Sequence, residues 1–336
     1  MRPDVDRLIG ESPAFVKTLE QVSVIAPLDK PVLLVGERGT GKELIAARLH
    51  YLSNRWEGQF LKMNCAAIAE SLLETELFGH EAGAFTGATK THHGRFERAH
   101  GGTLFLDELA TTSMLVQEKL LRVIEYGEFE RVGGSKTLTC DVRLVAATNE
   151  DLPRLARQGK FRADLLDRLA FDVLTLPPLR EREEDIDILA EHFAVGMAKE
   201  LDREYFAGFS EHARAVLQTY DWPGNVRELK NVVERCVYRT DHDELVTEVT
   251  LDPFESPFRP KAPAAEETTT RPHDFPLDLK AHIRDYEIEI INQAMDRARH
   301  NQRKAAELLG VTYHQLRGYL KKYQLVGAGG PDPDDD

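Results

Sequence analysis

The strongest constraint on the fold is a glycine-rich segment that directly follows a short apolar run. Val32–Val35 fits a buried strand, and a helix-period segment follows the glycines. The pattern between them is GxxxxGK, in which backbone N–H groups curl around phosphates and a lysine meets the β and γ oxygens. Glu43 stands where the general pattern has the Ser or Thr that ligates Mg²⁺, so the ion needs other groups. The predicted phosphate loop is Gly36, Glu37, Arg38, Gly39, Thr40, Gly41, Lys42 and Glu43.

A second apolar strand ends in two adjacent acids. Thr103–Leu106 leads into Asp107, which is placed to hold Mg²⁺ through water, and Glu108, which is placed to polarise an attacking water. A solvated acidic turn is the alternative, but a phosphate loop in the same chain disfavours it. Together the two segments predict a site that binds and hydrolyses ATP.

Short β-branched runs alternate with helical segments up to about residue 173, which is typical of a sheet with crossover helices. One run, Arg143–Ala147, ends in Thr148 and Asn149, where we expect a polar amide near the γ-phosphate and the attacking water. The sequence thus predicts an α/β fold with a mostly parallel sheet. The expected strands are Val32–Val35, Phe60–Met63, Thr103–Leu106, Arg143–Ala147 and Phe171–Leu176.

The pattern changes further along the chain. After two prolines, residues 183–238 show only helical spacing, and residues 253–278 are rich in proline with few large apolar side chains. We therefore predict an α/β ATPase subdomain at 1–176, a helical lid at 177–252, an extended linker at 253–278, a helix-turn-helix domain at 279–325 and a disordered acidic tail at 326–336.

Residues 301–322 read as a helix, a glycine-containing turn and a second helix. They carry five basic residues and one acidic residue, in a chain whose formal net charge is −14. This local charge suits DNA phosphates, although an ordinary helical hairpin is an alternative. The preceding helix, from about Leu279 to Ala298, could pair two copies on a two-fold DNA site. The candidate DNA contacts are Arg303, Lys304, Thr312, Tyr313, His314, Gln315, Arg317 and Lys321.

Several function classes are disfavoured by composition. Every apolar run is too short to span a bilayer, and the first residues carry acids and a proline where an export signal needs apolar residues. Cys65, Cys140 and Cys236 are widely spaced, so we expect three reduced thiols and no cysteine-based metal site. These observations predict a cytoplasmic protein.

These motifs resemble those of the bacterial enhancer-binding proteins, AAA+ ATPases that activate sigma-54 RNA polymerase, and most of all those of the phage shock system. The resemblance runs from about Leu8 to Leu325, and GKE is the family's usual phosphate loop. It implies ATP and Mg²⁺, an active hexamer, enhancer DNA, and opening of the sigma-54 polymerase closed complex at envelope stress genes. Its sharpest motif is GAFTGA, the loop that touches the sigma factor, made by Gly83, Ala84, Phe85, Thr86, Gly87 and Ala88.

The resemblance also implies roles that spacing alone does not reveal. Asn64 matches the position whose amide couples the nucleotide state to Glu108. Arg162 and Arg168 match arginines offered to a neighbouring subunit's γ-phosphate, although without the resemblance they fit a helix face of surface ion pairs. Arg227 matches the lid arginine that senses nucleotide. The second pore loop is Arg131, Val132, Gly133 and Gly134.

Trp56 lies among polar and turn residues, where a core tryptophan is not expected. A partly buried ring is one interpretation. The other is a docking side chain for an inhibitor: because no sensor domain precedes the ATPase in this sequence, we expect a separate negative regulator, as the phage shock resemblance implies.

Two other functions use the same fold. A non-hydrolysing DNA-binding repressor would have a damaged GAFTGA loop or lack Glu108, and both are intact. An AAA+ replication initiator or unfoldase would also hydrolyse ATP, but GAFTGA argues against it. The sequence therefore favours the sigma-54 activator.

Overall fold

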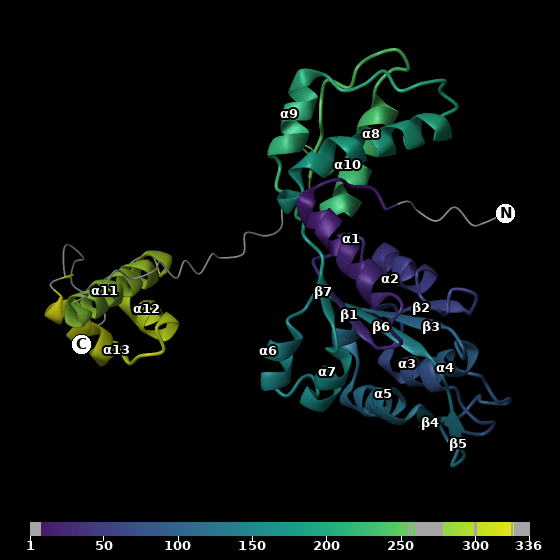
Figure 1. The fold of residues 1–336 in the computed structure, drawn as a ribbon. Coiled ribbons are helices and arrows are strands. Elements are labelled where there is room, and N and C mark those ends of the chain that lie inside the picture. Colours follow the sequence, from purple (N-terminus) through teal and green to yellow (C-terminus); the bar gives the residue numbers. More distant parts are fainter. Residues whose placement is uncertain are drawn as a thin grey trace. The chain divides into compact units, whose positions relative to one another are not determined.

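The computed structural model describes residues 8–254, 256, 258–259, 278–298, 301–323 and 325. The chain divides into two compact units, Met1–Glu255 and Ser256–Asp336 (Figure 1). Most of the predicted linker and all of the predicted acidic tail lie outside the described residues. None of the helices in the described ranges has the length and apolar character needed to cross a membrane.

Unit 1 is built on a five-stranded sheet with the order β2-β3-β6-β1-β7, and every pair of neighbours is parallel. The strands are β1 (Val32–Val35), β2 (Phe60–Asn64), β3 (Thr103–Asp107), β6 (Arg143–Thr148) and β7 (Val173–Thr175). Each lies within two residues of its predicted limits. The edge strand β7 is shorter than expected because its predicted first residue, Phe171, is exposed and unpaired with β1.

Helices cover both faces of the sheet. Consecutive residues of a strand point to opposite faces, and in these strands both sets of residues are apolar. Leu33 packs with the cluster of α3 (Glu70–Phe78), α5 (Met114–Tyr126) and α7 (Ala163–Leu169), whereas Leu34 packs with α1 (Pro13–Ile25) and α2 (Lys42–Tyr51). The predicted α/β arrangement of a mostly parallel sheet flanked by helices is therefore present. Shorter helices complete it: η1 (Cys65–Ala67), α4 (Arg95–Arg98), η2 (Leu109–Thr111) and α6 (Leu152–Arg157). The three cysteines are buried and free.

A second, two-stranded antiparallel sheet lies outside these layers and was not predicted. It joins β4 (Glu128–Glu130) to β5 (Thr137–Thr139). Three residues are too few for an alternating pattern to stand out in the sequence, and Phe129 is the buried side chain of β4. The hairpin packs beside the segment that connects α3 to α4 through the bridge of His80 to Val132.

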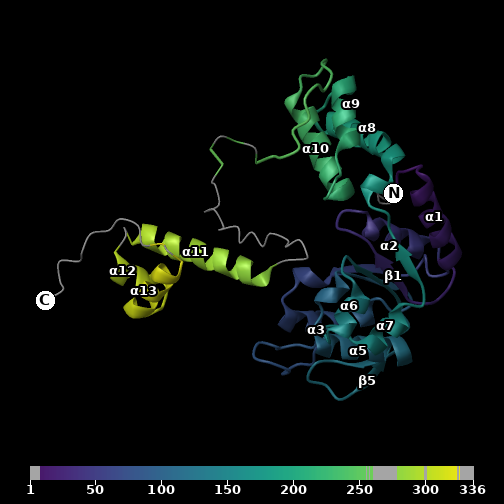
Figure 2. The same cartoon turned by 90° about the vertical axis from the view of Figure 1, so that its left-hand side faces the viewer.

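The lid of unit 1 consists of η3 (Leu179–Glu181), α8 (Glu183–Glu200), α9 (Glu211–Thr219) and α10 (Asn225–Arg239). Figures 1 and 2 show its helices gathered above the sheet. Its core includes Trp222, which is fully buried and donates its indole N–H to the carbonyl of Leu217 at 2.9 Å.

A buried ion pair joins the start of the lid to the segment before α1. Arg182 Nε donates to Asp185 Oδ2 at 2.7 Å, and both side chains are almost fully buried. Asp185 also accepts from Glu11 N at 2.5 Å and from Ser12 N and Oγ, both at 2.8 Å. The Arg182 guanidinium lies 3.8 Å above the ring of Phe15. The partners of this carboxylate therefore come from a segment more than 170 residues away and from Arg182, the residue that precedes α8.

Unit 2 contains the helices α11 (Leu279–Arg297), α12 (Gln302–Leu308) and α13 (Tyr313–Lys322). They enclose a small core that includes Ile291, Ala305 and Leu316. The turn between α12 and α13 passes through Gly310, whose φ of 63° favours glycine. This is the helix, turn and helix that the sequence predicts.

Candidate functional site

The residues predicted to bind nucleotide meet at the carboxyl edge of the sheet. Val35, the last residue before the phosphate loop, pairs with Thr148, and Asn64 pairs with Asp107. Because the strands are parallel and adjacent, segments far apart in the sequence end side by side. The predicted convergence of these segments is therefore present.

The phosphate loop is closed by its own lysine. Lys42 Nζ donates to the carbonyls of Gly36 at 2.8 Å and Glu37 at 2.9 Å. Burial lowers the pKa of Lys42, and the nearby Asp107 and Glu108 carboxylates oppose that shift. A half-buried cation hydrogen-bonded to neutral carbonyls is suited to exchange them for phosphate oxygens.

The two acids at the end of β3 lie in different environments. Burial raises the pKa of Asp107, whose Oδ1 accepts from the backbone N–H of Glu108 at 2.9 Å. Glu108 has a left-handed backbone with φ of 52°, and its carboxylate lies 3.5 Å from Arg38 of the phosphate loop. Asp107 is thus partly buried at the end of β3, whereas Glu108 is held by an exposed cation that can release it.

Two polar side chains near these acids have local partners. Asn64 Oδ1 accepts from Ala66 N at 2.9 Å and Ala67 N at 3.1 Å, which caps η1. Within the described residues no hydrogen bond joins Asn64 to Glu108, so the coupling implied by the resemblance is not made in this conformation. Thr148 is fully buried and its Oγ1 accepts from Glu150 N, while Asn149 is exposed beside it.

The lid touches the phosphate loop directly. Val226 N donates to the carbonyl of Gly39 at 3.1 Å, and a Cβ at Gly39 would lie 2.3 Å from the carbonyl oxygen of Gly224 and 3.2 Å from Cβ of Arg227. A side chain at position 39 therefore has no room, and Arg227 lies beside the phosphate loop. Arg180 and Asn225, which sequence reasoning missed, also contact this loop.

The GAFTGA loop is a tight, exposed turn. Gly83 N donates to the carbonyl of Ala88 at 2.7 Å, and Ala88 N donates to the carbonyl of Phe85 at 3.0 Å. Phe85 is 43% exposed, and its ring centroid lies 4.9 Å from that of His80. The predicted contact tip therefore presents a partly exposed aromatic ring beside His80, with the two ring planes tilted by 60°.

The second loop is bound to the stem of the first. Arg131 donates to Glu81 at 2.7 Å and to Glu97 at 2.6 and 2.9 Å. Burial alone would raise the pKa of Glu97, but hydrogen bonds from Arg131 and His93 lower it to about 2. A Cβ at Gly133, whose φ is +74°, would lie 2.6 Å from Cβ of Ala84. The two predicted pore loops are thus in contact, while Val132 and Gly134 form the backbone of the second turn.

Of the two predicted trans-acting arginines, Arg162 is the N-cap residue of α7 and Arg168 lies in its last turn, and both have partners within the chain. Arg162 donates to Asp164 at 3.0 and 2.7 Å, and Arg168 donates to Glu125 at 2.7 Å. The side chain of Arg168 is 57% exposed. Both ion pairs are at the surface, where such pairs contribute little and can be exchanged.

The predicted DNA contacts separate into two groups in unit 2. Thr312 and Gln315 form a capping box at the start of α13, so their side chains bond to each other and to the backbone. The guanidinium groups of Arg303 and Arg317 lie 6.0 and 5.8 Å from the ring centroid of Tyr313. The remaining candidates are exposed: Arg303, Lys304, His314, Arg317 and Lys321.

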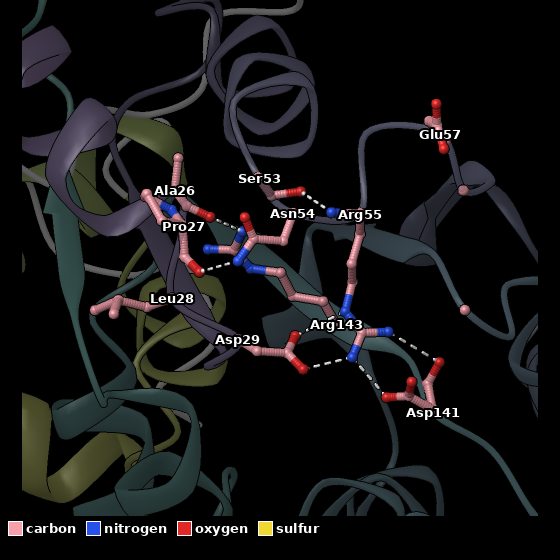
Figure 3. Close-up of a pocket in the computed structure, with 12 residues that line it drawn as sticks. Ala26, Pro27, Leu28, Asp29, Ser53, Asn54, Arg55, Glu57, Asp141 and Arg143 are labelled. Carbon is pink, nitrogen blue, oxygen red and sulfur yellow. Dashed lines mark hydrogen bonds and ion pairs between the residues drawn. The ribbon is translucent and has the colours of Figure 1, made fainter.

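A surface cavity of about 410 Å³ lies at the amino edge of the sheet, away from the phosphate loop. Figure 3 shows Arg55 reaching between Asp29 and Asp141, with Arg143 bonded to the carbonyl of Ala26. Arg55 fixes the segment that carries Trp56, whose side chain is 56% exposed. Trp56 is therefore a surface residue, as its polar neighbours suggested.

Three family matches cover the chain. Residues 8–175 match the sigma-54 interaction domain, residues 180–270 match the AAA+ ATPase lid domain, and residues 282–323 match the bacterial regulatory protein Fis family. These matches confirm the predicted combination of an AAA+ α/β domain, a helical lid and a helix-turn-helix.

Three other proteins are similar to nearly the whole of this chain. The Psp operon transcriptional activator of Escherichia coli (strain K12) is 61% identical over 321 residues, which cover 95% of this chain and 98% of that protein. The transcriptional regulatory protein ZraR of Salmonella typhimurium is 44% identical over 94% of this chain and 68% of its own length. The crystal structure of NtrX from Brucella abortus in complex with ATP has a TM-score of 0.68 and 35% identity, covering 95% of this chain and 70% of that one. The chain therefore belongs to the sigma-54-dependent transcriptional activators, and it is an AAA+ ATPase with a helix-turn-helix DNA-binding domain.

Proposed function

We propose that this chain binds an upstream enhancer and uses ATP hydrolysis to remodel the sigma-54 polymerase closed complex into the open complex at phage shock promoters. The observation that carries this proposal is the exposed Phe85 loop, whose stem is bound through Arg131 to a second loop of an ATPase domain. If the ATPase domain changes conformation with its nucleotide, a contact loop attached to it can transmit that movement to a partner. The 61% identity to the Psp operon activator supports the choice of promoter class.

In this proposal the carboxyl edge of the sheet turns over ATP. The backbone of residues 36–43 and Lys42 hold the phosphates, Glu108 polarises the attacking water, and Arg227 senses the nucleotide from the lid. Asn64 couples the nucleotide state to Glu108, and Thr148 and Asn149 place a polar amide near the γ-phosphate and the attacking water. The Arg38 ion pair keeps Glu108 away from that task until nucleotide displaces it.

Mg²⁺ fits this site as an ion shared with the nucleotide. No group of three or more His, Cys, Asp or Glu side chains gathers as a metal site anywhere in the described ranges. Mg²⁺ is commonly held by one or two carboxylates together with phosphates. Asp107, whose pKa burial raises, would hold it, and the ion would neutralise phosphate charge during hydrolysis.

Hydrolysis in this proposal requires a ring, with a hexamer as the active form. Arg162 and Arg168 exchange their ion pairs for the γ-phosphate of the neighbouring subunit. A trans-acting arginine is worth about 10³ to 10⁵ in rate in related phosphoryl transfers. Their surface position supports this role, because neither side chain is committed to the core.

Enhancer binding is proposed for unit 2. The exposed cations on α12 and α13 contact DNA phosphates and bases, and both Arg303 and Arg317 lie near the ring of Tyr313. Leu279, Ile283 and Tyr286 leave a row of exposed apolar side chains on α11. We propose that this row pairs two copies on a two-fold site.

The domain limits 1–176, 177–252, 253–278, 279–325 and 326–336 form part of the same proposal. They are supported by the end of β7 at Thr175 and by the start of the lid family match at residue 180. The DNA-tethered role places the protein in the cytoplasm with the polymerase.

Control is proposed to come from a separate negative regulator that docks at Trp56. The exposed ring, on a segment fixed by Arg55, supports a docking role. Replacing Trp56 with Ala should abolish binding of the phage shock negative regulator while ATPase activity persists. Unchanged binding would remove this part of the proposal.

The central test is open-complex formation with sigma-54 polymerase on an enhancer-bearing template. Opening about ten base pairs costs on the order of 14 kcal/mol in stacking, so ATP should support it and a non-hydrolysable analogue should not. Thr86→Ala should hydrolyse ATP but fail to open DNA. Thr89→Ala, in the same connecting segment but outside the motif, is the matched control and should open DNA normally.

Two results would contradict the proposal. Robust ATPase activity without any opening would mean that the target is not the polymerase, and an initiator or unfoldase would have to be considered. Equal loss of opening in both threonine variants would mean that the GAFTGA motif is not the contact element.

A further inference from the structure

The phosphate loop carries a carboxylate where it must receive a highly charged anion. Glu37 follows the first glycine of the loop, and a free negative charge there would repel the triphosphate. In the structure this charge is not free. Arg180 of η3 donates to both carboxylate oxygens of Glu37, at 2.6 and 3.0 Å. The Arg180 and Asn225 hydrogen bonds lower the pKa of Glu37 to about 2, so the carboxylate stays charged and paired near neutral pH.

Asn225 closes the same contact from the lid. Its Nδ2 donates to Glu37 Oε2 and to the carbonyl of Arg38, both at 3.0 Å, and its Oδ1 accepts from Leu179 N at 2.8 Å. The side chain is fully buried, and the backbone has φ of 53°, a left-handed conformation that asparagine tolerates better than most residues. Both donor hydrogens and the acceptor of this amide are therefore used.

Aspartate cannot replace this asparagine without loss. A carboxylate at position 225 would keep the acceptor for Leu179 N, but it would lose both donors and place a second negative charge beside Glu37. Leucine would leave buried polar groups of both the loop and the lid unpaired. The position therefore selects for an amide by hydrogen bonding as well as by backbone conformation.

We propose that Glu37, Arg180 and Asn225 form a clasp that positions the lid on the phosphate loop and neutralises the loop's own carboxylate for ATP binding. Arg180 and Asn225 are positioning residues. They act through Glu37 and through the backbone of residues 38 and 179, next to the contact of Gly39 with Gly224 that brings Arg227 to the site. Because nucleotide binds at one end of the clasp, its affinity and the lid position are linked.

The charges of Arg180, Glu37 and the nucleotide determine how the clasp should affect binding. Removing the Arg180 charge leaves Glu37 facing the phosphates, so ATP affinity should fall by about ten-fold, which corresponds to about 1.4 kcal/mol. ADP carries less negative charge and should lose less. Both losses should shrink at high ionic strength, because the side chains are 42% and 43% exposed and salt screens such charges.

The test is a double-mutant cycle on the full chain, with ATP and ADP binding measured by competition against a fluorescent ATP analogue at two salt concentrations. The variants are Arg180→Gln, Glu37→Gln and the two combined. Arg214→Gln is the matched control, because Arg214 is a lid arginine of similar exposure, 39%, whose ion pairs are with Glu191 and Asp187. Thermal unfolding of each variant is followed in parallel.

The expected result is a salt-dependent loss of ATP affinity in Arg180→Gln, recovery in the double variant to within about two-fold of Glu37→Gln, and no change in Arg214→Gln. Arg180→Lys should bind ATP more tightly than Arg180→Gln but less tightly than the wild type, because lysine cannot donate to both Glu37 carboxylate oxygens in the same geometry. A merely structural role for Arg180 would instead lower the unfolding temperature without nucleotide-selective loss.

Three outcomes would overturn the inference: unchanged ATP affinity in Arg180→Gln, no recovery in the double variant, or equal loss in the Arg214→Gln control. The inference rests on ATP binding by this chain and not on polymerase remodelling. Because the assay contains nucleotide alone, a failure of the proposed function at the promoter would leave this result intact, and the reverse also holds.

Discussion

Replacing Asp185 with Ala should destabilise unit 1 strongly, because it would leave a buried guanidinium without its counterion. Arg182 is 2% exposed and Asp185 is completely buried. Removing one partner of a buried pair costs about 3–5 kcal/mol. The backbone N–H groups of Glu11 and Ser12 would also lose their acceptor, so the loss reaches the segment before α1 as well as the lid.

Thermal unfolding measures this cost. For domains of 150–250 residues about 1 kcal/mol shifts the midpoint by about 2–4 °C, so the loss predicts a decrease of about 6–20 °C. Asp187→Ala is the matched control, since Asp187 lies on the same helix as Asp185. Its side chain is 42% exposed, and its ion pair with Arg214 is long, at 3.9 Å. It should cost at most about 1 kcal/mol. Equal midpoints for the two variants would refute the reasoning.

The same pair predicts a dependence on pH. Burial alone would raise the pKa of Asp185, but the hydrogen bonds from Arg182, Glu11 and Ser12 hold it below its ordinary value of 3.8. A carboxyl whose pKa is lower in the folded state stabilises the fold above the unfolded pKa, and this contribution is lost as the pH falls through the folded value. The stabilities of wild type and Asp185→Ala should therefore differ at neutral pH and converge below pH 3.8.

Three further predictions concern the nucleotide site and unit 2. Glu108→Gln should lower the steady-state ATPase rate by about 10²–10⁴ while ATP binding persists, and an unchanged rate would exclude its role as the base. Burial raises the pKa of Asp107 above 3.8, so on acidification Mg²⁺-dependent nucleotide binding should weaken at a higher pH than it would with a carboxyl of ordinary pKa. Asp107→Asn should remove that pH dependence. Titrations showing the same pH dependence in both proteins would argue against a ligand role. Arg317→Ala should weaken binding to all DNA sequences and reduce the slope of log affinity against log salt by about 1; a loss confined to one sequence would instead indicate base contact.

The fold and the nucleotide site could be predicted because their signals are local in the sequence. A strand such as Val32–Val35 and the glycines that follow it are contiguous, and parallel pairing then brings the strand ends together. The convergence of Asp107 and Thr148 on the phosphate loop follows from the same topology. Family resemblance added Arg227, which no spacing rule connects to Lys42.

Other contacts could not be predicted because they join distant segments through single side chains. Glu37 and Asn225 are 188 residues apart, and Asp185 and Ser12 are 173 apart. Nothing in the sequence distinguishes Asn225 or Asp185 from the many asparagines and aspartates that lie in turns. Asn64 shows the opposite limit, because a local cap of η1 takes the amide oxygen that the resemblance assigns to nucleotide sensing.

The two tryptophans of this chain lie in opposite environments, and this gives the protein an intrinsic optical reporter. Trp222 is fully buried in the lid, edge-on to Tyr220 at 5.0 Å and three residues from Asn225, whereas Trp56 is 56% exposed. A Trp56→Phe variant would leave a single indole whose emission arises from the lid alone. Stopped-flow fluorescence of that variant could then follow lid motion upon mixing with nucleotide, without any attached dye.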